Sequence, residues 1–124
     1  MYRVGIITAS DKGSRGERVD ESGAKIKEIV GEHTTVMSLM NGVDSEEIIG
    51  ERYGAEHMIY AVAQGMDAMK FGAELTYSKM GVLCIGARLE SQQEGLDRVC
   101  CLFDRTELPY VREKDILHRL WSKF

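Results

Sequence analysis

The chain has 124 residues, 44% of them hydrophobic and 29% charged, which suits one domain with a single core. Its formal net charge of −4 argues against nucleic-acid binding, because nucleic-acid surfaces are usually basic. No apolar run approaches the roughly 20 residues that span a bilayer, and residues 1–4 lack the apolar region of a signal peptide. Three cysteines without disulfide-like spacing indicate a reducing compartment, so we expect a cytoplasmic protein that binds neither nucleic acid nor membrane.

Strand and helix patterns alternate in the first part of the chain. The apolar run over residues 4–9 predicts a buried parallel strand, and residues 10–23 form a charged loop. Isoleucine and valine at helical spacing predict a helix over residues 24–30, which Gly31 would end. The apolar run over residues 34–40 predicts a second strand.

The middle of the chain predicts a short helix followed by extended runs. Asp44 begins the helix as a capping residue, and Gly54 ends it. Residues 57–64 predict the third strand. Further runs lie between glycines, and their turns are too short for helical crossovers, so we expect an antiparallel extension. These runs cover residues 66–71, 74–78 and 80–85. The methionines here are expected to fill the core: Met58, Met66, Met69 and Met80.

The last third of the chain predicts a helix, a strand and a second helix. Ser91 and Glu94 match a capping box ahead of an apolar stripe of helical period. The stripe consists of Leu96, Val99, Cys100 and Phe103. Residues 108–112 predict a last strand, and residues 114–124 predict a helix whose face at Trp121 requires a partner.

Two side chains are candidates for chemistry on a ligand. Asn41 and Gly42 close the second predicted strand, at the place where open α/β sheets bind ligands, although the pair equally fits an ordinary turn. Lys123 lies near the C-terminus, where a lone lysine is usually a surface residue. A carboxamide and an amine together would suit work on a carbonyl group, with the lysine as general acid.

The loop that follows the first predicted strand offers hydroxyls, backbone amides and two cations, which suit a phosphate group. An ordinary solvated loop has the same composition. The loop matches neither G-x-G-x-x-G nor G-x-x-x-x-G-K-[ST]. The three histidines are widely separated, so we expect no metal site.

From residue 24 to residue 124 the chain resembles ketopantoate reductase (2-dehydropantoate 2-reductase), in the later part of its nucleotide-binding domain. The matching motifs occur in the family's order: Val30–Glu32, Ser38–Gly50, Tyr60–Gly65, Gly81–Gly86, Asp115–Ile116 and Trp121–Phe124. The resemblance implies an α/β fold, here a partial Rossmann-like sheet with flanking helices and an antiparallel extension. We expect it to form a single domain over residues 1–124.

The resemblance also implies a site and a reaction. In that family the asparagine of the N-G motif contributes to the cofactor and substrate site, and the lysine of the W-x-K motif is the general acid. These roles fall here on Asn41 and Lys123. The cofactor would be NADP and the small-molecule substrate ketopantoate. The family's G-x-G-x-x-G turn and C-terminal helical domain have no counterpart in this sequence, so a non-catalytic chimeric or truncated fragment is a second hypothesis.

Residues 2–23 instead resemble the start of the MogA/MoaB family of molybdenum-cofactor biosynthesis. The match runs through Val4–Ser14, Gly16, Asp20 and Ser22–Gly23. In that family this loop borders the pterin site, so a molybdopterin-binding or adenylyl-transfer protein is a third hypothesis. The cofactor-binding residues that this resemblance implies are Ser10, Asp11, Lys12, Gly13 and Ser14. If the chain is instead a reductase, the same loop would have to hold the NADP phosphates. Exposed sheet edges and the face at Trp121 further predict a homo-oligomer.

Overall fold

The structure is a computed structural model that describes residues 2–6 and 28–123. The chain divides into two compact units, residues 1–34 and residues 35–124. The single domain expected over residues 1–124 stays a prediction. None of the helices in the described ranges is long and apolar enough to cross a membrane.

The first unit holds little regular structure in its described part. Residues 4–6 are exposed and are not a strand, so the expectation of a strand from residue 4 is wrong there, while residues 7–9 lie outside the described ranges. β-Branched residues favour a strand only where a neighbouring strand pairs with them. Glu28 and Ile29 are helical, and the helix ends by Gly31, whose backbone N–H donates to the Thr34 hydroxyl at 2.9 Å.

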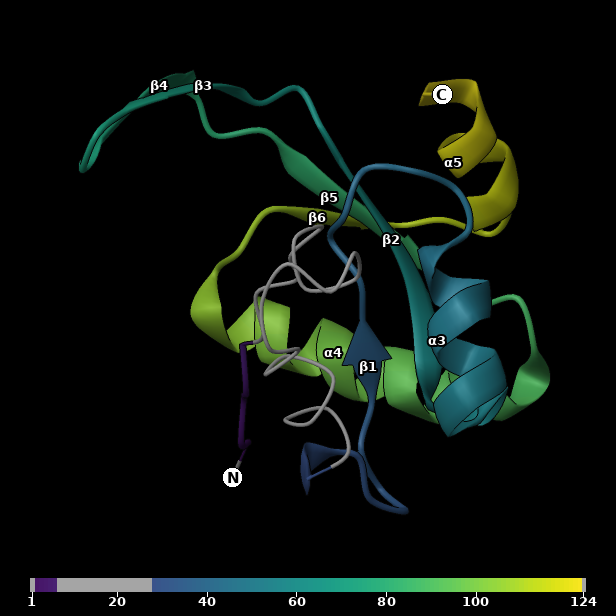
Figure 1. The fold of residues 1–124 in the computed structure, drawn as a ribbon. Coiled ribbons are helices and arrows are strands. Elements are labelled where there is room, and N and C mark those ends of the chain that lie inside the picture. Colours follow the sequence, from purple (N-terminus) through teal and green to yellow (C-terminus); the bar gives the residue numbers. More distant parts are fainter. Residues whose placement is uncertain (1, 7–27, 124) are drawn as a thin grey trace, which may run out of the picture. The chain divides into compact units, whose positions relative to one another are not determined.

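The second unit is built on a four-stranded mixed sheet, with the strands in the order β1-β2-β5-β6 (Figure 1). The strands are β1 (Val36–Met37), β2 (Met58–Gln64), β5 (Val82–Gly86) and β6 (Tyr110–Arg112). β1 runs parallel to β2, β5 runs antiparallel to β2, and β6 runs parallel to β5. The expected α/β sheet with an antiparallel extension is confirmed.

Three helices accompany this sheet: α3 (Ser45–Tyr53), α4 (Gln93–Thr106) and α5 (Ile116–Lys123). Two short 3-10 turns, η1 (Ala55–His57) and η2 (Glu90–Gln92), precede β2 and α4. α3 ends at Gly54, as expected, where φ is +107°. Asp44 stands at the start of α3, but its side chain makes no capping hydrogen bond. The predicted position of Asp44 at the start of the helix is confirmed, but the predicted hydrogen bond from its side chain is wrong.

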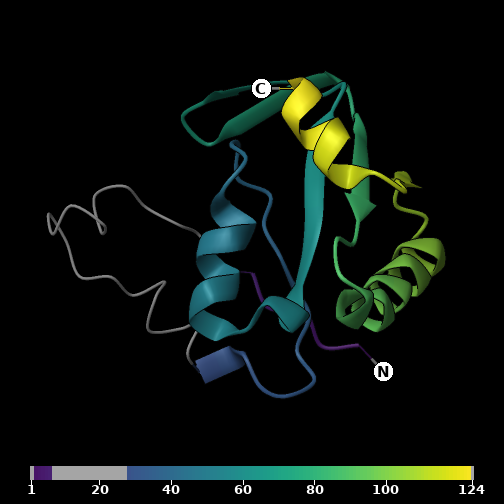
Figure 2. The same cartoon turned by 90° about the vertical axis from the view of Figure 1, so that its right-hand side faces the viewer.

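Alternate side chains of the central strands enter two separate cores. The helices of these cores, α4 in yellow-green and α5 in yellow, lie apart from one another in Figure 2. Ile59 and Ala61 of β2 point to α4, whose stripe of Leu96, Cys100 and Phe103 is buried against them. Tyr60 and Val62 point to the opposite face, where the helix α5 packs. A strand buried on both faces needs this alternation, because successive side chains point to opposite sides. The predicted apolar stripe of α4 is confirmed.

A buried glutamine, rather than the expected Ser91–Glu94 capping box, fixes the start of α4. The helix begins at Gln93 and Ser91 lies in the turn η2, one residue too early for that box. Gln92 is 2% exposed, its Oε1 accepts the backbone N–H groups of Arg88 and Leu89, and its Nε2 donates to Ala55 O at 2.8 Å. The glutamine thus joins the β5–α4 connection to η1.

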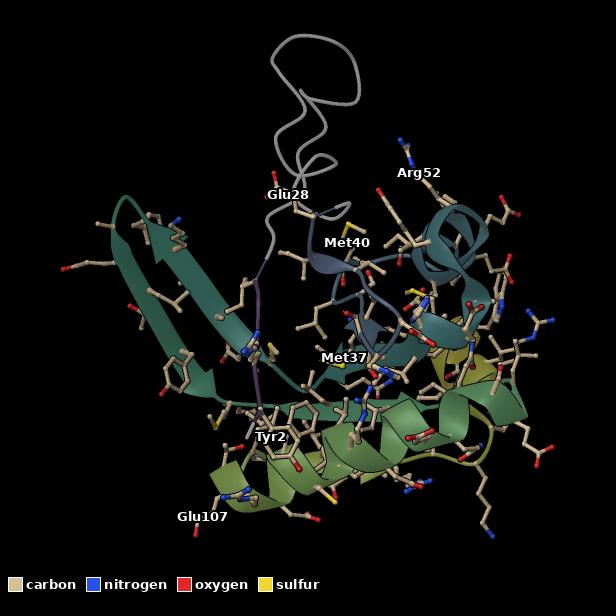
Figure 3. All side chains as sticks on the ribbon, turned by 90° about the horizontal axis from the view of Figure 1, so that it is seen from below. Tyr2, Glu28, Met37, Met40, Arg52 and Glu107 are labelled. Atoms are coloured by element: carbon tan, nitrogen blue, oxygen red, sulfur yellow. The ribbon has the colours of Figure 1, made fainter. Side chains whose placement is uncertain are left out.

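The antiparallel hairpin β3 (Asp67–Phe71) and β4 (Glu74–Lys79) extends away from the four-stranded sheet, and both of its strands are exposed (Figures 1 and 3). The hairpin is confirmed, but the expectation that its methionines fill a core is wrong. Met69 is 59% exposed, whereas Met58 of β2 is 1% exposed. A two-stranded hairpin has no third element to cover it. Whether the chain self-associates stays a prediction.

β1 is shorter than the expected strand over residues 34–40, because it pairs with β2 only through Val36 and Met37. A buried carboxylate lies at the start of α3, after the end of β1. The Ser45 hydroxyl donates to the Glu46 carboxylate at 3.0 Å, and this bond and the backbone N–H groups of Glu46 and Ala61 lower the pKa of the carboxyl group. Glu46 is 2% exposed, and this burial raises the pKa of its carboxyl group against the lowering effect of these hydrogen bonds.

We predict that Leu96→Ala lowers the free energy of unfolding by about 2–5 kcal/mol, the usual cost of a cavity in a packed core. Leu96 is 1% exposed in the core between α4 and the sheet. Chemical denaturation measures the change. Leu75→Ala, at a position 65% exposed on the hairpin, is the matched control and should change the free energy by about 0.5 kcal/mol or less. Equal losses in the two variants would contradict the packing described above.

We predict a second effect, on the pH dependence of stability. Because the pKa of Glu46 is raised in the folded state, the folded protein retains its proton at higher pH than the unfolded chain does. The resulting stabilisation is complete below about pH 4.5, the ordinary value, and is lost as the pH rises through the raised pKa. Glu46→Gln should remove this decline in urea titrations at a series of pH values. The exposed Glu51→Gln should retain it, and an unchanged decline in Glu46→Gln would refute the assignment.

Candidate functional site

The structure brings together the two side chains that the sequence singled out, although 82 positions separate them. Lys123 is the last residue of α5, and Asn41 lies in the loop between β1 and α3. The Lys123 Nζ lies 3.3 Å from Asn41 Oδ1 and 2.7 Å from the backbone oxygen of Ala63 in β2. An ammonium group, a carboxamide and a carbonyl oxygen therefore meet at one point, which we call the Lys–Asn corner.

The corner lies at the carboxyl ends of the two parallel strands. Asn41 follows β1, and Ala63 is the penultimate residue of β2. The carboxyl edge of parallel strands is where open α/β sheets bind their ligands. Lys123 and Asn41 are both exposed, so a small molecule can reach them from solvent.

Hydroxyl groups and a glycine shape the loop that carries Asn41. The Ser38 hydroxyl accepts the backbone N–H of Met40 at 3.4 Å and lies 2.9 Å from the Ser45 hydroxyl at the start of α3. Gly42 has a φ of +130°, which favours glycine. Asn41 and Gly42 lie in a bend of the backbone, where one interpretation predicted an ordinary turn, and the Asn41 side chain reaches Lys123 from this bend.

The opposite partner, Lys123, is placed by the packing of α5. Ile116 and Leu120 are each 1% exposed in the core on this face of the sheet. Gly86, at the end of β5, lets the helix approach closely, since an added Cβ there would lie 2.7 Å from Ile116 Cβ. The Asp115 carboxylate accepts the His118 backbone N–H at 3.1 Å and caps the helix. The last turn, from Trp121 to Lys123, is exposed.

One residue of this region went unnoticed in the sequence. Arg119 stands one helical turn before Lys123, and its guanidinium forms an ion pair with Glu113 at 2.8 Å and reaches Gln64 Oε1 at 3.4 Å. The sequence contains one signal for Arg119: it lies four residues before a candidate lysine, and residues at this spacing share one face of a helix. Its two acceptors are far away in the sequence or on another element, so only the structure reveals the arrangement.

The other expected site residues, Ser10, Asp11, Lys12, Gly13 and Ser14, lie outside the described residues. Their roles stay predictions. Within the described ranges, no group of three or more histidine, cysteine or acidic side chains is arranged to hold a metal ion. Cys100 is buried and Cys101 is exposed, because successive residues of α4 point to different sides of the helix.

The Lys–Asn corner can act chemically on a polar, electron-rich ligand atom. A lysine ammonium donates hydrogen bonds or a proton, and the Asn41 amide both donates and accepts. The backbone oxygen of Ala63 accepts a hydrogen bond from the ammonium and orients it. This set suits a carbonyl oxygen on which negative charge develops.

Comparison with known proteins assigns the chain to a family. The family model described as Ketopantoate reductase PanE/ApbA matches residues 18–90, which is more than half of the chain. The match begins before residue 24, where the resemblance was expected to start, and includes Asn41 but not Lys123. No curated protein matches the chain. No finding supports the resemblance of residues 2–23 to MogA/MoaB, and the family match begins inside that segment.

Solved structures share the fold. The 2-dehydropantoate 2-reductase of Geobacter metallireducens GS-15 aligns with 90% of this chain at 23% identity and a TM-score of 0.70. That of Porphyromonas gingivalis W83 aligns with 84% at 19% identity and 0.71. A candidate 2-dehydropantoate 2-reductase of Enterococcus faecalis aligns with 93% at 16% identity and 0.72. This chain spans 35–37% of those three chains.

Two independent findings therefore agree on the main resemblance that the motifs indicated. The family model covers the Asn-Gly turn and the strands around it, and the aligned structures share the arrangement of sheet and helices. The chain belongs to the ketopantoate reductase PanE/ApbA family.

Proposed function

We propose that this chain carries the proton-donating corner of an NADPH-dependent 2-dehydropantoate 2-reductase. The observation that supports the proposal is the contact of Lys123 Nζ with Asn41 Oδ1 at 3.3 Å, next to Ala63 O at 2.7 Å. Family membership and the reductase names of the aligned structures point to the same reaction.

Lys123 is the general acid in this proposal. NADPH, when bound, would supply the hydride that joins the carbonyl carbon of the substrate. The electron pair of the C=O bond then moves to the oxygen, and the Lys123 ammonium gives that oxygen a proton, so a hydroxyl group forms. The neutral amine regains a proton from water. Before transfer, the positive charge of the ammonium stabilises the negative charge developing on the oxygen.

Asn41 and Ala63 orient the acid. Their oxygens accept hydrogen bonds from Lys123 Nζ, which limits the positions open to a long, flexible side chain. The carboxamide NH₂ of Asn41 remains chemically suited to a carbonyl group of the cofactor or the substrate.

The residues of the corner fit the reacting end of a nicotinamide cofactor and its carbonyl substrate, because they offer a cation and a neutral amide. The sequence contains no G-x-G-x-x-G turn to hold a pyrophosphate. We assign Asn41 to the cofactor because its neutral amide suits a carboxamide partner, and Lys123 to the substrate carbonyl because it is the proton donor. Activity of the whole reductase is a proposal for a chain that spans 35–37% of its aligned relatives.

We predict that Lys123→Ala lowers the kcat of NADPH-dependent reduction of 2-dehydropantoate by about 10²- to 10⁴-fold, the usual contribution of a general acid. The loss of NADPH absorbance measures the rate. Lys114→Ala, an exposed lysine just before α5, is the matched control and should retain the rate of the unchanged chain. Equal rates in the Lys123→Ala variant and the unchanged chain would exclude Lys123 as the acid.

We predict a different effect for Asn41→Asp. The variant keeps an oxygen acceptor for Lys123 but loses the NH₂ donor and gains a negative charge. It should weaken NADPH binding by about 2- to 12-fold, the worth of one hydrogen bond, in calorimetric titration. Asn41→Ala should weaken it to a similar degree, whereas undiminished binding in both variants would remove Asn41 from the cofactor site. Absence of both NADPH binding and turnover in the unchanged chain would support the non-catalytic fragment.

A further inference from the structure

We propose that Arg119 is a positioning residue for Lys123: its guanidinium fixes the last turn of α5 against the sheet and thereby sets the place of the Lys123 amine. This inference rests on the proposed function, because it assigns Arg119 a task in the same reaction. Arg119 acts through Lys123 and does not itself touch the reacting atoms.

Arg119 joins α5 to two other parts of the fold. Its Nη2 and Nε lie 2.8 and 3.0 Å from Glu113 Oε1, and its Nη1 lies 3.4 Å from Gln64 Oε1. Glu113 follows β6 and is itself fixed to β5, since its backbone N–H donates to Ile85 O at 2.8 Å. Gln64 ends β2 and is the neighbour of Ala63, whose oxygen receives Lys123.

The bridge and the corner therefore share one strand end. Arg119 and Lys123 are four residues apart and lie on the same side of the helix. One reaches Gln64 and the other reaches Ala63, so α5 is attached to the end of β2 at two adjacent residues. A shift of α5 along the strand would have to break both contacts.

The bridge lies where apolar anchoring stops. Ile116 and Leu120 are buried, but Trp121 is 62% exposed and Ser122 and Lys123 are exposed as well. Helix ends fray when few buried contacts hold them. The guanidinium of Arg119 attaches the helix to the end of β2 one turn before Lys123. The charge of Arg119 also acts on Cys84. Burial raises the pKa of the Cys84 thiol, and the positive charge of Arg119 lowers it.

Arginine suits this task better than lysine. A guanidinium presents donors in a fixed, planar fork, so it can hold a carboxylate and an amide oxygen at the same time. A lysine at this place would pair with Glu113 as a single charge but would not fix the direction of Gln64. The side chains of Arg119 and Glu113 are 42% and 21% exposed, and such pairs add little to global stability. A change in catalysis that is larger than the change in stability is thus expected.

Three variants of the full 124-residue chain test the inference. Arg119→Ala removes the bridge, and Arg119→Lys keeps the charge without the fork. Arg88→Ala is the matched control, because Arg88 forms an exposed ion pair at 3.1 Å with Glu47, a residue of α3. Thermal unfolding of each variant establishes that it is folded.

The first readout is steady-state turnover of 2-dehydropantoate with NADPH. We expect Arg119→Ala to lower kcat by about 10- to 100-fold with the KM for 2-dehydropantoate nearly unchanged, because a small misplacement of a reacting group has an effect of this size. Arg119→Lys should recover part of the loss, and Arg88→Ala should match the unchanged chain. A raised KM with unchanged kcat in Arg119→Ala would overturn the inference and indicate that the guanidinium binds the substrate carboxylate.

The second readout does not depend on activity. In protein containing isotope-labelled lysine, the side-chain amine signal of Lys123 is identified by its loss in Lys123→Arg. We expect Arg119→Ala to move this signal toward that of Lys114, an exposed lysine outside the Lys–Asn corner, while Arg88→Ala leaves it in place. An unmoved signal in folded Arg119→Ala would overturn the inference.

The two readouts separate the inference from the proposed function. If the unchanged chain has no turnover but the amine signal moves in Arg119→Ala, the positioning role holds and the reductase activity fails. If the unchanged chain is active and Arg119→Ala alters neither kcat nor the amine signal, the activity holds and the positioning role fails.

Discussion

The strand β2 is buried on both of its faces, and the rest of the second unit depends on that constraint. Its alternate side chains supply one core with α4 and another with α5. Helices on both faces then bring distant parts of the chain to the same strand end. The contact of Lys123 with Ala63 O follows from this arrangement, since α5 can reach the carboxyl end of β2 only when Ile116 and Leu120 are packed beneath it.

Buried polar side chains make hydrogen bonds near the irregular parts of this sheet. β1 pairs with β2 through two residues only, and the buried carboxylate of Glu46 in α3 accepts the Ser45 hydroxyl. Gln92 similarly satisfies three backbone groups around η1 and α4. Buried polar groups need such partners, because an unmet hydrogen bond away from water is costly. The loop with Asn41 therefore lies between β1, which pairs with β2, and α3, whose Glu46 is buried.

The hairpin β3–β4 differs from the four-stranded sheet, because its apolar side chains are not buried. Its apolar side chains, including Phe71 at 72% and Leu75 at 65% exposure, face solvent on both sides of a two-stranded ribbon. The sequence predicted its strands correctly, because glycines at both ends and short turns leave no other structure. It misplaced Met66, Met69 and Met80 in a core, because composition does not tell whether a third layer covers a strand pair.

The sequence by itself determined the local elements and the chemical types at the site. Periodicity predicted the buried stripe of α4, and motifs indicated Asn41 and Lys123 as candidates and the ketopantoate reductase family for the chain. Only the tertiary structure decided that the two residues meet, that Arg119 joins their neighbourhood, and that Gln92 replaces the expected cap of α4. The physical reason is range: spacing reports contacts within a helix or strand, whereas contacts between residues 41, 64 and 123 depend on how helices pack across a sheet.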